Sequence, residues 1–177
     1  MRRVKLFGAA RSHPVLTGGA GLTAALAFFS MLFADRQIVI NTSPSVQPGL
    51  YVRSSDAPRV GAIIDFRIPP MAREYVRVRT GNNGENWYIL KPIVAGPGDR
   101  IDTTGSWMVI NGRRIAPMPP PGDRAGHPLP IWHARRILGP GEFFVFSGRI
   151  TNSFDSRCYG PIKRNQIESV RTPMLTW

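Results

Sequence analysis

The sequence predicts an all-β, barrel-like domain behind one N-terminal apolar segment. Among its 177 residues are 17 prolines and 18 glycines, which favour short strands joined by turns over long helices. From residue 38 onward, short apolar runs are bounded by Pro, Gly or Asp, as is typical of strands. Residues 15–34 carry no charge and, as a helix, would span about 30 Å, the thickness of a bilayer's hydrocarbon core.

The chain is expected to have three parts: a cytoplasmic basic tail over 1–14, a transmembrane anchor or uncleaved signal over 15–34, and an exported domain over 35–177. Four basic residues precede the apolar run, so the positive-inside rule leaves the amino terminus in the cytoplasm; they are Arg2, Arg3, Lys5 and Arg11. The alternative is a secretory signal cleaved at Ala25-Leu26-Ala27, which exports the same domain. A buried soluble helix is disfavoured because the run is apolar all round.

Within the exported domain, the strands are expected in segments of alternating or continuous apolar character. They are Leu50–Arg53, Ala62–Phe66, Tyr75–Val78, Trp87–Ala95, Met108–Ile115, Glu142–Phe146 and Gln166–Val170. Met108–Ile115 is expected to be a hairpin, because Asn-Gly tolerates the positive φ of a type I′ turn. Residues 117–130 hold six prolines and two glycines, so we expect a loop or embellishment there and not core, within a Pro-rich excursion between about 103 and 138.

The composition excludes several classes of site. The net charge is +12, but the basic residues are scattered and no aromatic-interleaved basic block is present, so no direct nucleic-acid contact is expected. The charge then belongs to a solvated or membrane-proximal surface. One cysteine, Cys158, allows neither an internal disulfide nor a cysteine zinc site. Walker, dinucleotide-binding and HExxH motifs are missing from the sequence, so we expect no cofactor and no metal.

Ser45 and Lys91 are the candidate catalytic pair. Pro44 and Pro48-Gly49 flank Ser45 and would hold its hydroxyl in a rigid loop. On an extended strand, Lys91 shares its face with Ile89 and Ile93. Burial there would lower the lysine pKa from about 10.4 to about 8 at a cost of about 3 kcal/mol, and a neutral lysine is a general base. The plain alternatives are a Ser-rich turn and a structural lysine that snorkels to solvent.

A late cluster of small polar residues supplies the candidate supporting groups. The Ser153 hydroxyl, placed beside Lys91, would orient the lysine lone pair toward Ser45. Asp155 is expected to hold the loop through Arg157 or a backbone amide and to keep away from Lys91, because a carboxylate there would raise the lysine pKa. The plain alternative is a turn with an Asp–Arg ion pair. None of the three histidines has an obvious carboxylate neighbour, so nothing points to a Ser-His-Asp triad.

Taken together, these blocks resemble the type I signal peptidase family. Ser45, three residues before Pro48, matches the family's nucleophile, and Lys91, ahead of Gly96-Pro97-Gly98-Asp99, matches its general base. Ser153-Phe154-Asp155-Ser156-Arg157 matches the late box whose serine orients the lysine, and Ser43 falls where the family places a hydroxyl donor to the oxyanion. The resemblance covers essentially the whole chain and implies a signal-peptidase-like β-barrel catalytic domain.

Three departures point to one branch of that family. Val46 stands where bacterial signal peptidases usually have methionine, Pro92 follows the lysine where they have arginine, and residues 147–151 replace an acidic run. The segments 41–51, 126–130 and 153–161 look more like the TraF branch, the conjugative-transfer peptidases.

That branch implies an activity, partners and a location. The activity is cleavage, with or without cyclisation, of the pilin precursor of a type IV secretion system. The expected partners are this precursor, the inner membrane and other conjugative transfer proteins. The expected location is the periplasmic face of the inner membrane, or the periplasm if the signal is cleaved. The alternatives are a general signal peptidase, a self-cleaving repressor-type protease, which the anchor disfavours, and a non-catalytic membrane scaffold of the conjugation machinery.

Overall fold

The computed structural model describes residues 23, 25–31, 37–81 and 87–177. The chain divides into two units, Met1–Gln37 and Ile38–Trp177. In the first, residues 25–31 are helical, while the predicted tail and most of the predicted anchor lie outside the described residues. Among the helices that are described, none has the length and apolar character needed to cross a bilayer.

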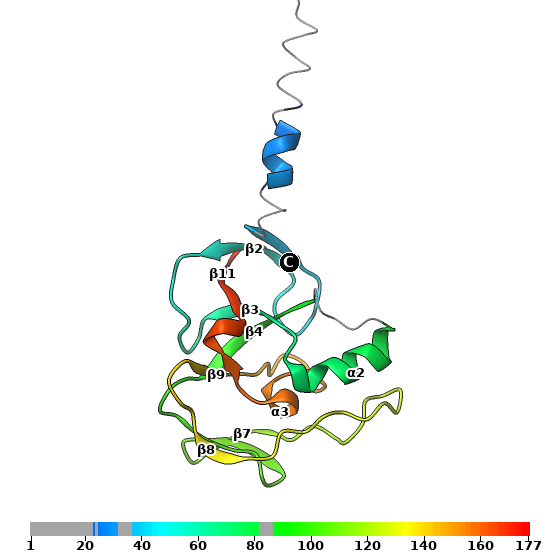
Figure 1. Cartoon of the computed structure of the whole chain (residues 1–177), viewed down its shortest axis with the longest axis vertical. Coiled ribbons are helices and arrows are strands. Elements are labelled where there is room, and N and C mark those ends of the chain that lie inside the picture. The colour runs from blue at the N-terminus through cyan, green and yellow to red at the C-terminus, as the bar shows by residue number, and fades with distance from the viewer. Residues whose placement is uncertain (1–22, 24, 32–36, 82–86) are drawn as a thin grey trace, which may run out of the picture. The chain divides into compact units, whose positions relative to one another are not determined.

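The second unit is built on two antiparallel sheets (Figure 1). The larger has the order β1-β2-β11-β3-β4-β9-β10 and the smaller the order β7-β6-β5-β8. The strands of the larger sheet are β1 (Ile38–Asn41), β2 (Gly49–Ser54), β3 (Ile63–Arg67), β4 (Tyr88–Ala95), β9 (Glu142–Val145), β10 (Ile162–Lys163) and β11 (Ile167–Thr176). Those of the smaller are β5 (Arg100–Asp102), β6 (Trp107–Ile110), β7 (Arg113–Pro117) and β8 (Arg135–Ile137).

The expectation of a closed barrel is wrong. The larger sheet is open, with β1 and β10 as its two edges. Closure would require these edges to pair, but β10 contributes only two residues and β1 only four. The described strands therefore form open sheets that pack through their side chains, and the domain is mostly β.

Most predicted strands are confirmed, and so is the hairpin. The segments expected at 50–53, 62–66, 87–95, 142–146 and 166–170 correspond to β2, β3, β4, β9 and β11. β6 and β7 pair antiparallel across Asn111-Gly112, whose φ angles of 50° and 81° are both positive, as a type I′ turn requires.

The strand predicted at Tyr75–Val78 is wrong, because this segment lies in helix α2 (Pro70–Thr80). Pro70 occupies the first turn, where a missing N–H costs nothing, and Gly81 ends the helix in the left-handed conformation. Its buried residues, Ala72, Tyr75 and Val76, follow the helical period rather than the strand period of two. The domain is therefore not purely β.

Two apolar clusters form the core, and β4 takes part in both. Ile93 belongs to the cluster under β3, α2 and β11, whereas Ala95 belongs to the cluster under the smaller sheet. The segment 103–138 carries three strands of that smaller sheet and buries Met108 and Ala116, so much of it packs in a core of its own. The rest, between β7 and β8, is the Pro-rich run that passes by α2 and α3 (Ser156–Tyr159) in Figure 1.

A buried polar network fixes β11 against β3. Arg171 Nη2 donates to Asp65 Oδ2 at 2.7 Å, and Ser169 Oγ donates to Asp65 Oδ1 at 2.6 Å. All three side chains are buried, with Arg171 and Asp65 at 2% and 1% exposure. β3 in turn pairs with Lys91 of β4, so this network lies one strand away from the candidate base.

Arg171→Met is expected to lower the free energy of unfolding by about 3–5 kcal/mol, because it leaves the Asp65 carboxylate buried and uncompensated. Replacing both partners, in Asp65→Leu/Arg171→Met, should restore most of that loss. Urea denaturation provides the measurement. The control is Arg135→Met, which removes the exposed Arg135–Asp102 pair and should cost less than about 1 kcal/mol. An equally small effect of Arg171→Met would show that the buried Asp65–Arg171 pair does not stabilise the domain.

Candidate active site

The loop that carries Ser45 is the connection of the β1–β2 hairpin, closed by the pairing of Asn41 with Gly49. The Asn41 side-chain amide holds it from inside. Its Nδ2 donates to the carbonyls of Ser43, Val46 and Gln47 at 3.0, 3.0 and 3.1 Å, and its Oδ1 accepts from Ser43 N at 3.2 Å. One buried asparagine thereby satisfies four backbone groups and makes the loop rigid. The sequence analysis missed this role, although Asn at the start of a turn is its usual signal.

Ser45 and Lys91, 46 residues apart in the chain, meet in the structure. Lys91 Nζ lies 2.5 Å from Ser45 Oγ, and the two side chains are 4% and 3% exposed. Along β4 the buried residues are Lys91, Ile93 and Ala95, which places the lysine on the apolar face as predicted. The pair therefore has the contact that proton transfer from a serine to a lysine requires.

Burial is the main influence on Lys91 and lowers its pKa to about 8. The nearby Asp155 carboxylate raises the lysine pKa and the Arg157 guanidinium lowers it, so these two charges oppose each other. An amine with a pKa near 8 is partly neutral at physiological pH, whereas an exposed lysine is almost entirely charged. The environment therefore suits Lys91 to act as a base.

Ser43 lies where an oxyanion donor is expected. Its Oγ is 3.0 Å from Ser45 Oγ, and it accepts from Ser45 N–H at 3.4 Å. The second bond is long and readily exchanged for a stronger acceptor. The Ser43 hydroxyl and the Ser45 amide are thus both beside the nucleophile and both available to a developing oxyanion.

Asp155 and Arg157 form a buried bidentate ion pair. Arg157 Nε and Nη2 donate to the two carboxylate oxygens, each at 2.9 Å, and the Arg157 backbone N–H donates to Asp155 Oδ1 at 3.2 Å. Asp155 is the N-cap of α3. It is therefore held through Arg157 and a backbone amide, as predicted, and among the described residues no ion pair joins it to Lys91.

Ser153 departs from its predicted geometry. Its side chain is buried at 2% exposure, but the described residues offer its Oγ no hydrogen-bond partner. The bond expected between this hydroxyl and Lys91 is not formed, and the Lys91 ammonium donates to Ser45 Oγ. Ser153 lies against the Asp155–Arg157 pair instead, where its carbonyl accepts from Arg157 Nη2 at 3.3 Å.

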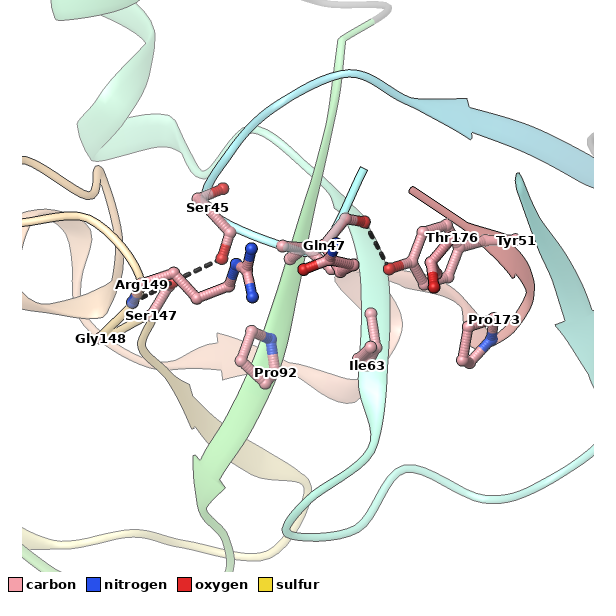
Figure 2. A pocket seen from close by; sticks show the side chains of 11 residues that line it. Ser45, Gln47, Tyr51, Ile63, Pro92, Ser147, Gly148, Arg149, Pro173 and Thr176 are labelled. Atoms are coloured by element: carbon pink, nitrogen blue, oxygen red, sulfur yellow. Dashed lines mark hydrogen bonds between the residues drawn. The ribbon is translucent and has the colours of Figure 1, made fainter. Parts of the chain in front are cut away.

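Ser147 and Arg149 also support the nucleophile loop, and the sequence analysis missed both. Figure 2 shows the hydrogen bond that Ser147 Oγ donates to the Ser45 carbonyl. Arg149 Nε donates to the Pro44 carbonyl at 3.2 Å, and Arg149 N to Ser147 Oγ at 3.3 Å. Ser45 is therefore held from the segment that follows β9 as well as by Asn41.

A pocket of about 390 Å³ opens beside Ser45 (Figure 2). Its walls are the nucleophile loop, Pro92 of β4, Ile63 of β3 and the end of β11. At that end, Trp177 N donates to the Pro48 carbonyl at 3.1 Å, and Gln47 Nε2 donates to the Trp177 backbone oxygen at 2.6 Å. The pocket is a mostly apolar groove of the kind that receives small side chains of a peptide.

Comparisons with known proteins show which family the chain resembles. The family model described as "Signal peptidase, peptidase S26" matches residues 14–175. A plasmid transfer protein TraF from Escherichia coli is 33% identical over 147 residues, which cover 78% of this chain and 82% of that protein. The conjugal transfer protein TraF from Agrobacterium tumefaciens (strain 15955) is 26% identical over 171 residues, covering 92% and 94%. A signal peptidase I from Enterococcus faecalis V583 aligns with a TM-score of 0.40 and 20% identity over 67% of this chain and 100% of that one.

Lys91→Met is expected to stabilise the protein at pH 7 and to have little effect near pH 10.5. The folded pKa of about 8 lies below the unfolded value, so the unfolded state binds more protons in the window between them. The stability of the wild type therefore rises with pH across that window. Below it the full penalty, about 3 kcal/mol, is present and the methionine variant is free of it.

Urea denaturation at pH 7 and pH 10.5 measures this difference. Lys163→Met, at an exposed position, is the control and should change stability by less than about 0.5 kcal/mol. A Lys91→Met protein that is less stable than the wild type by the same amount at both pH values would show that the lysine is not buried in its charged form.

Proposed function

The chain belongs to the signal peptidase S26 family, and on that basis we propose that it is a serine endopeptidase of conjugative plasmid transfer. Its substrate is the pilin precursor of a type IV secretion system. The observation that carries the proposal is the 2.5 Å contact between Lys91 Nζ and Ser45 Oγ in a buried site beside an open pocket. The similarity to plasmid transfer proteins supports the biological setting.

The reaction is acyl transfer through a Ser–Lys dyad. Neutral Lys91 takes the proton of Ser45 as the serine oxygen attacks the scissile carbonyl. The Ser45 N–H and the Ser43 hydroxyl donate to the oxyanion, an arrangement worth about 3–4 kcal/mol per donor in other proteases. When the C–N bond breaks, the leaving amine takes the proton from the Lys91 ammonium. Water, or an amine of the substrate itself, then releases the acyl-enzyme to a linear or a cyclic product.

The supporting residues act on the charge of Lys91. Arg157 balances the negative charge of the Asp155 carboxylate. The ion pair therefore anchors the loop without raising the pKa of Lys91 as an unpaired carboxylate would. Ser153 remains the predicted acceptor for the ammonium that forms during the reaction, a bond that the resting structure does not contain.

The proposed location is the periplasmic face of the inner membrane, where the N-terminal segment tethers the domain near a membrane-inserted precursor. Cleavage of that segment as a signal would leave the domain in the periplasm. A general signal peptidase is the nearest alternative, and the similarity to plasmid transfer proteins favours the narrower role. A non-catalytic scaffold would have no use for a buried lysine in contact with a serine.

Ser45→Ala and Lys91→Ala are each expected to abolish processing of the pilin precursor, because one removes the nucleophile and the other its base. The precursor is co-expressed with each variant and its products are measured by intact-mass spectrometry. A product one water lighter than the linear cleaved chain identifies cyclisation. The matched controls are the exposed Ser55→Ala and Lys163→Ala, which should process normally. Normal processing by both dyad variants would leave the scaffold as the better account.

The kcat/KM for precursor cleavage should rise with pH and reach half of its plateau at about pH 8. The base must be neutral in the free enzyme, and it loses its proton as the pH passes its pKa. Initial rates at low substrate concentration across this range give the profile. A profile that is flat between about pH 6 and pH 10 would exclude Lys91 as the titrating base.

A further inference from the structure

A second cavity, of about 570 Å³, lies on another side of the site. It is formed by α2, by the Pro-rich run between β7 and β8, and by the box loop that contains Ser153. In Figure 1 these three segments, green, yellow-green and orange, come together around α2 and α3. The volume lies within the range of ordinary ligand pockets and is larger than that of the pocket beside Ser45.

This cavity adjoins the surroundings of Lys91. Ser153 and Cys158 line it, and Cys158 belongs to the same buried cluster as Ile93, which shares the buried face of β4 with Lys91. The two cavities share no lining residue: Ser45 and Pro92 line the first, and the box loop lines the second. The first is therefore the nucleophile's pocket, and the second is a separate cavity bounded by the box loop.

The carboxylate that lines the second cavity, Asp123, is hydrogen-bonded by the protein itself. Asp123 Oδ1 accepts from the backbone N–H groups of Ala125 and His127, both at 2.9 Å. Its Oδ2 accepts from Tyr75 OH at 3.0 Å and lies 3.1 Å from His127 Nδ1. Burial raises the pKa of Asp123, but these hydrogen bonds outweigh it and hold the pKa at about 2. His127 thus has the carboxylate neighbour that the sequence analysis did not find, and its role is to fix the Pro-rich run.

Two guanidinium groups at the same cavity form no ion pair with a carboxylate of the described residues. Arg79 Nη1 donates to the neutral Tyr75 hydroxyl at 3.2 Å, and Arg124 makes no ion pair with any other described residue. Both arginines are exposed at the rim. Since Asp123 is saturated by its own loop, the cavity has an excess of positive charge with free N–H donors, which is the arrangement that binds a carboxylate.

We propose that this cavity is the subsite for the substrate segment that follows the scissile bond, and that Arg79 and Arg124 recognise its terminal carboxylate. The inference rests on the proposed function, because it assumes that the dyad cleaves a precursor, and it adds that the segment after the scissile bond is short. The leaving amine must collect its proton from Lys91, so the segment that carries this amine has to lie on the base's side of the site. A short peptide that ends in a carboxylate suits the volume and the charge of the cavity.

The test is direct binding of acetyl-tetra-alanine, with either a free carboxylate or a carboxamide at its end, to the full-length Ser45→Ala protein in detergent. Chemical-shift titration measures each affinity. We expect the carboxylate peptide to bind about tenfold more tightly than the amide, the effect of one charge-assisted contact. Arg79→Gln and Arg124→Gln should each reduce that preference, and the double variant should abolish it. The exposed Arg113→Gln is the matched control and should keep it.

Equal binding of the two peptides, absence of saturable binding by either, or a preference that survives in the double variant would each overturn the proposal. Because the measurement is made on a protein without its nucleophile, it does not depend on turnover. A carboxylate preference that disappears with the two arginines, in a chain whose wild type leaves the pilin precursor intact, would support the subsite and reject the proposed substrate. Normal processing of the pilin precursor by a protein that shows no carboxylate preference would support the proposed substrate and reject the subsite.

Discussion

A lysine amine buried in the middle of a sheet is the constraint around which the domain is arranged. Lys91 is 4% exposed, and lowering its pKa to about 8 costs about 3 kcal/mol, a large share of the stability of a small domain. β4 can carry this buried lysine because both neighbouring strands, β3 and β9, are held by contacts of their own. β3 is held by the Asp65–Arg171 pair, and β9 by the bond from Val145 N to Ser156 Oγ at 3.0 Å. The same rigidity keeps the lysine within reach of Ser45.

The charges around Lys91 show how the pKa of a buried amine can stay low near a carboxylate. Asp155 without a partner would raise the pKa of Lys91. Arg157 binds both carboxylate oxygens of Asp155 and lowers the pKa of Lys91. The pair also caps α3 and, through Arg157 Nη1, binds the Pro117 carbonyl at 2.7 Å. It thus anchors the box to the smaller sheet while contributing little net charge to the site.

Features that depend on a few neighbouring residues could be predicted from the sequence. A lysine between β-branched residues on one strand face, an Asn-Gly turn and an Asp two residues before Arg each act over a few positions, and each is found as predicted. Some missed features depend on distant partners, as where Ser147 reaches Ser45 across 102 residues. The role of Asn41 was missed although its partners are local. α2 was missed because Tyr75, Val76 and Val78 also suit a strand, and Pro70 and Gly81 decide for the helix. Closure of a barrel likewise depends on edge lengths that no single segment reveals.

The position of the base also bears on the choice between hydrolysis and cyclisation. In the proposed mechanism, Lys91 is neutral again in the acyl-enzyme, having given its proton to the leaving amine, and the second nucleophile must return a proton to the same nitrogen. By microscopic reversibility, an amine that attacks does so from the position that the first amine vacated. If the segment after the scissile bond occupies the cavity of Arg79 and Arg124, cyclisation requires that segment to depart before the substrate's amino terminus arrives. The outcome then depends on how long the emptied cavity excludes water, so affinity for the leaving segment and choice of acceptor are coupled.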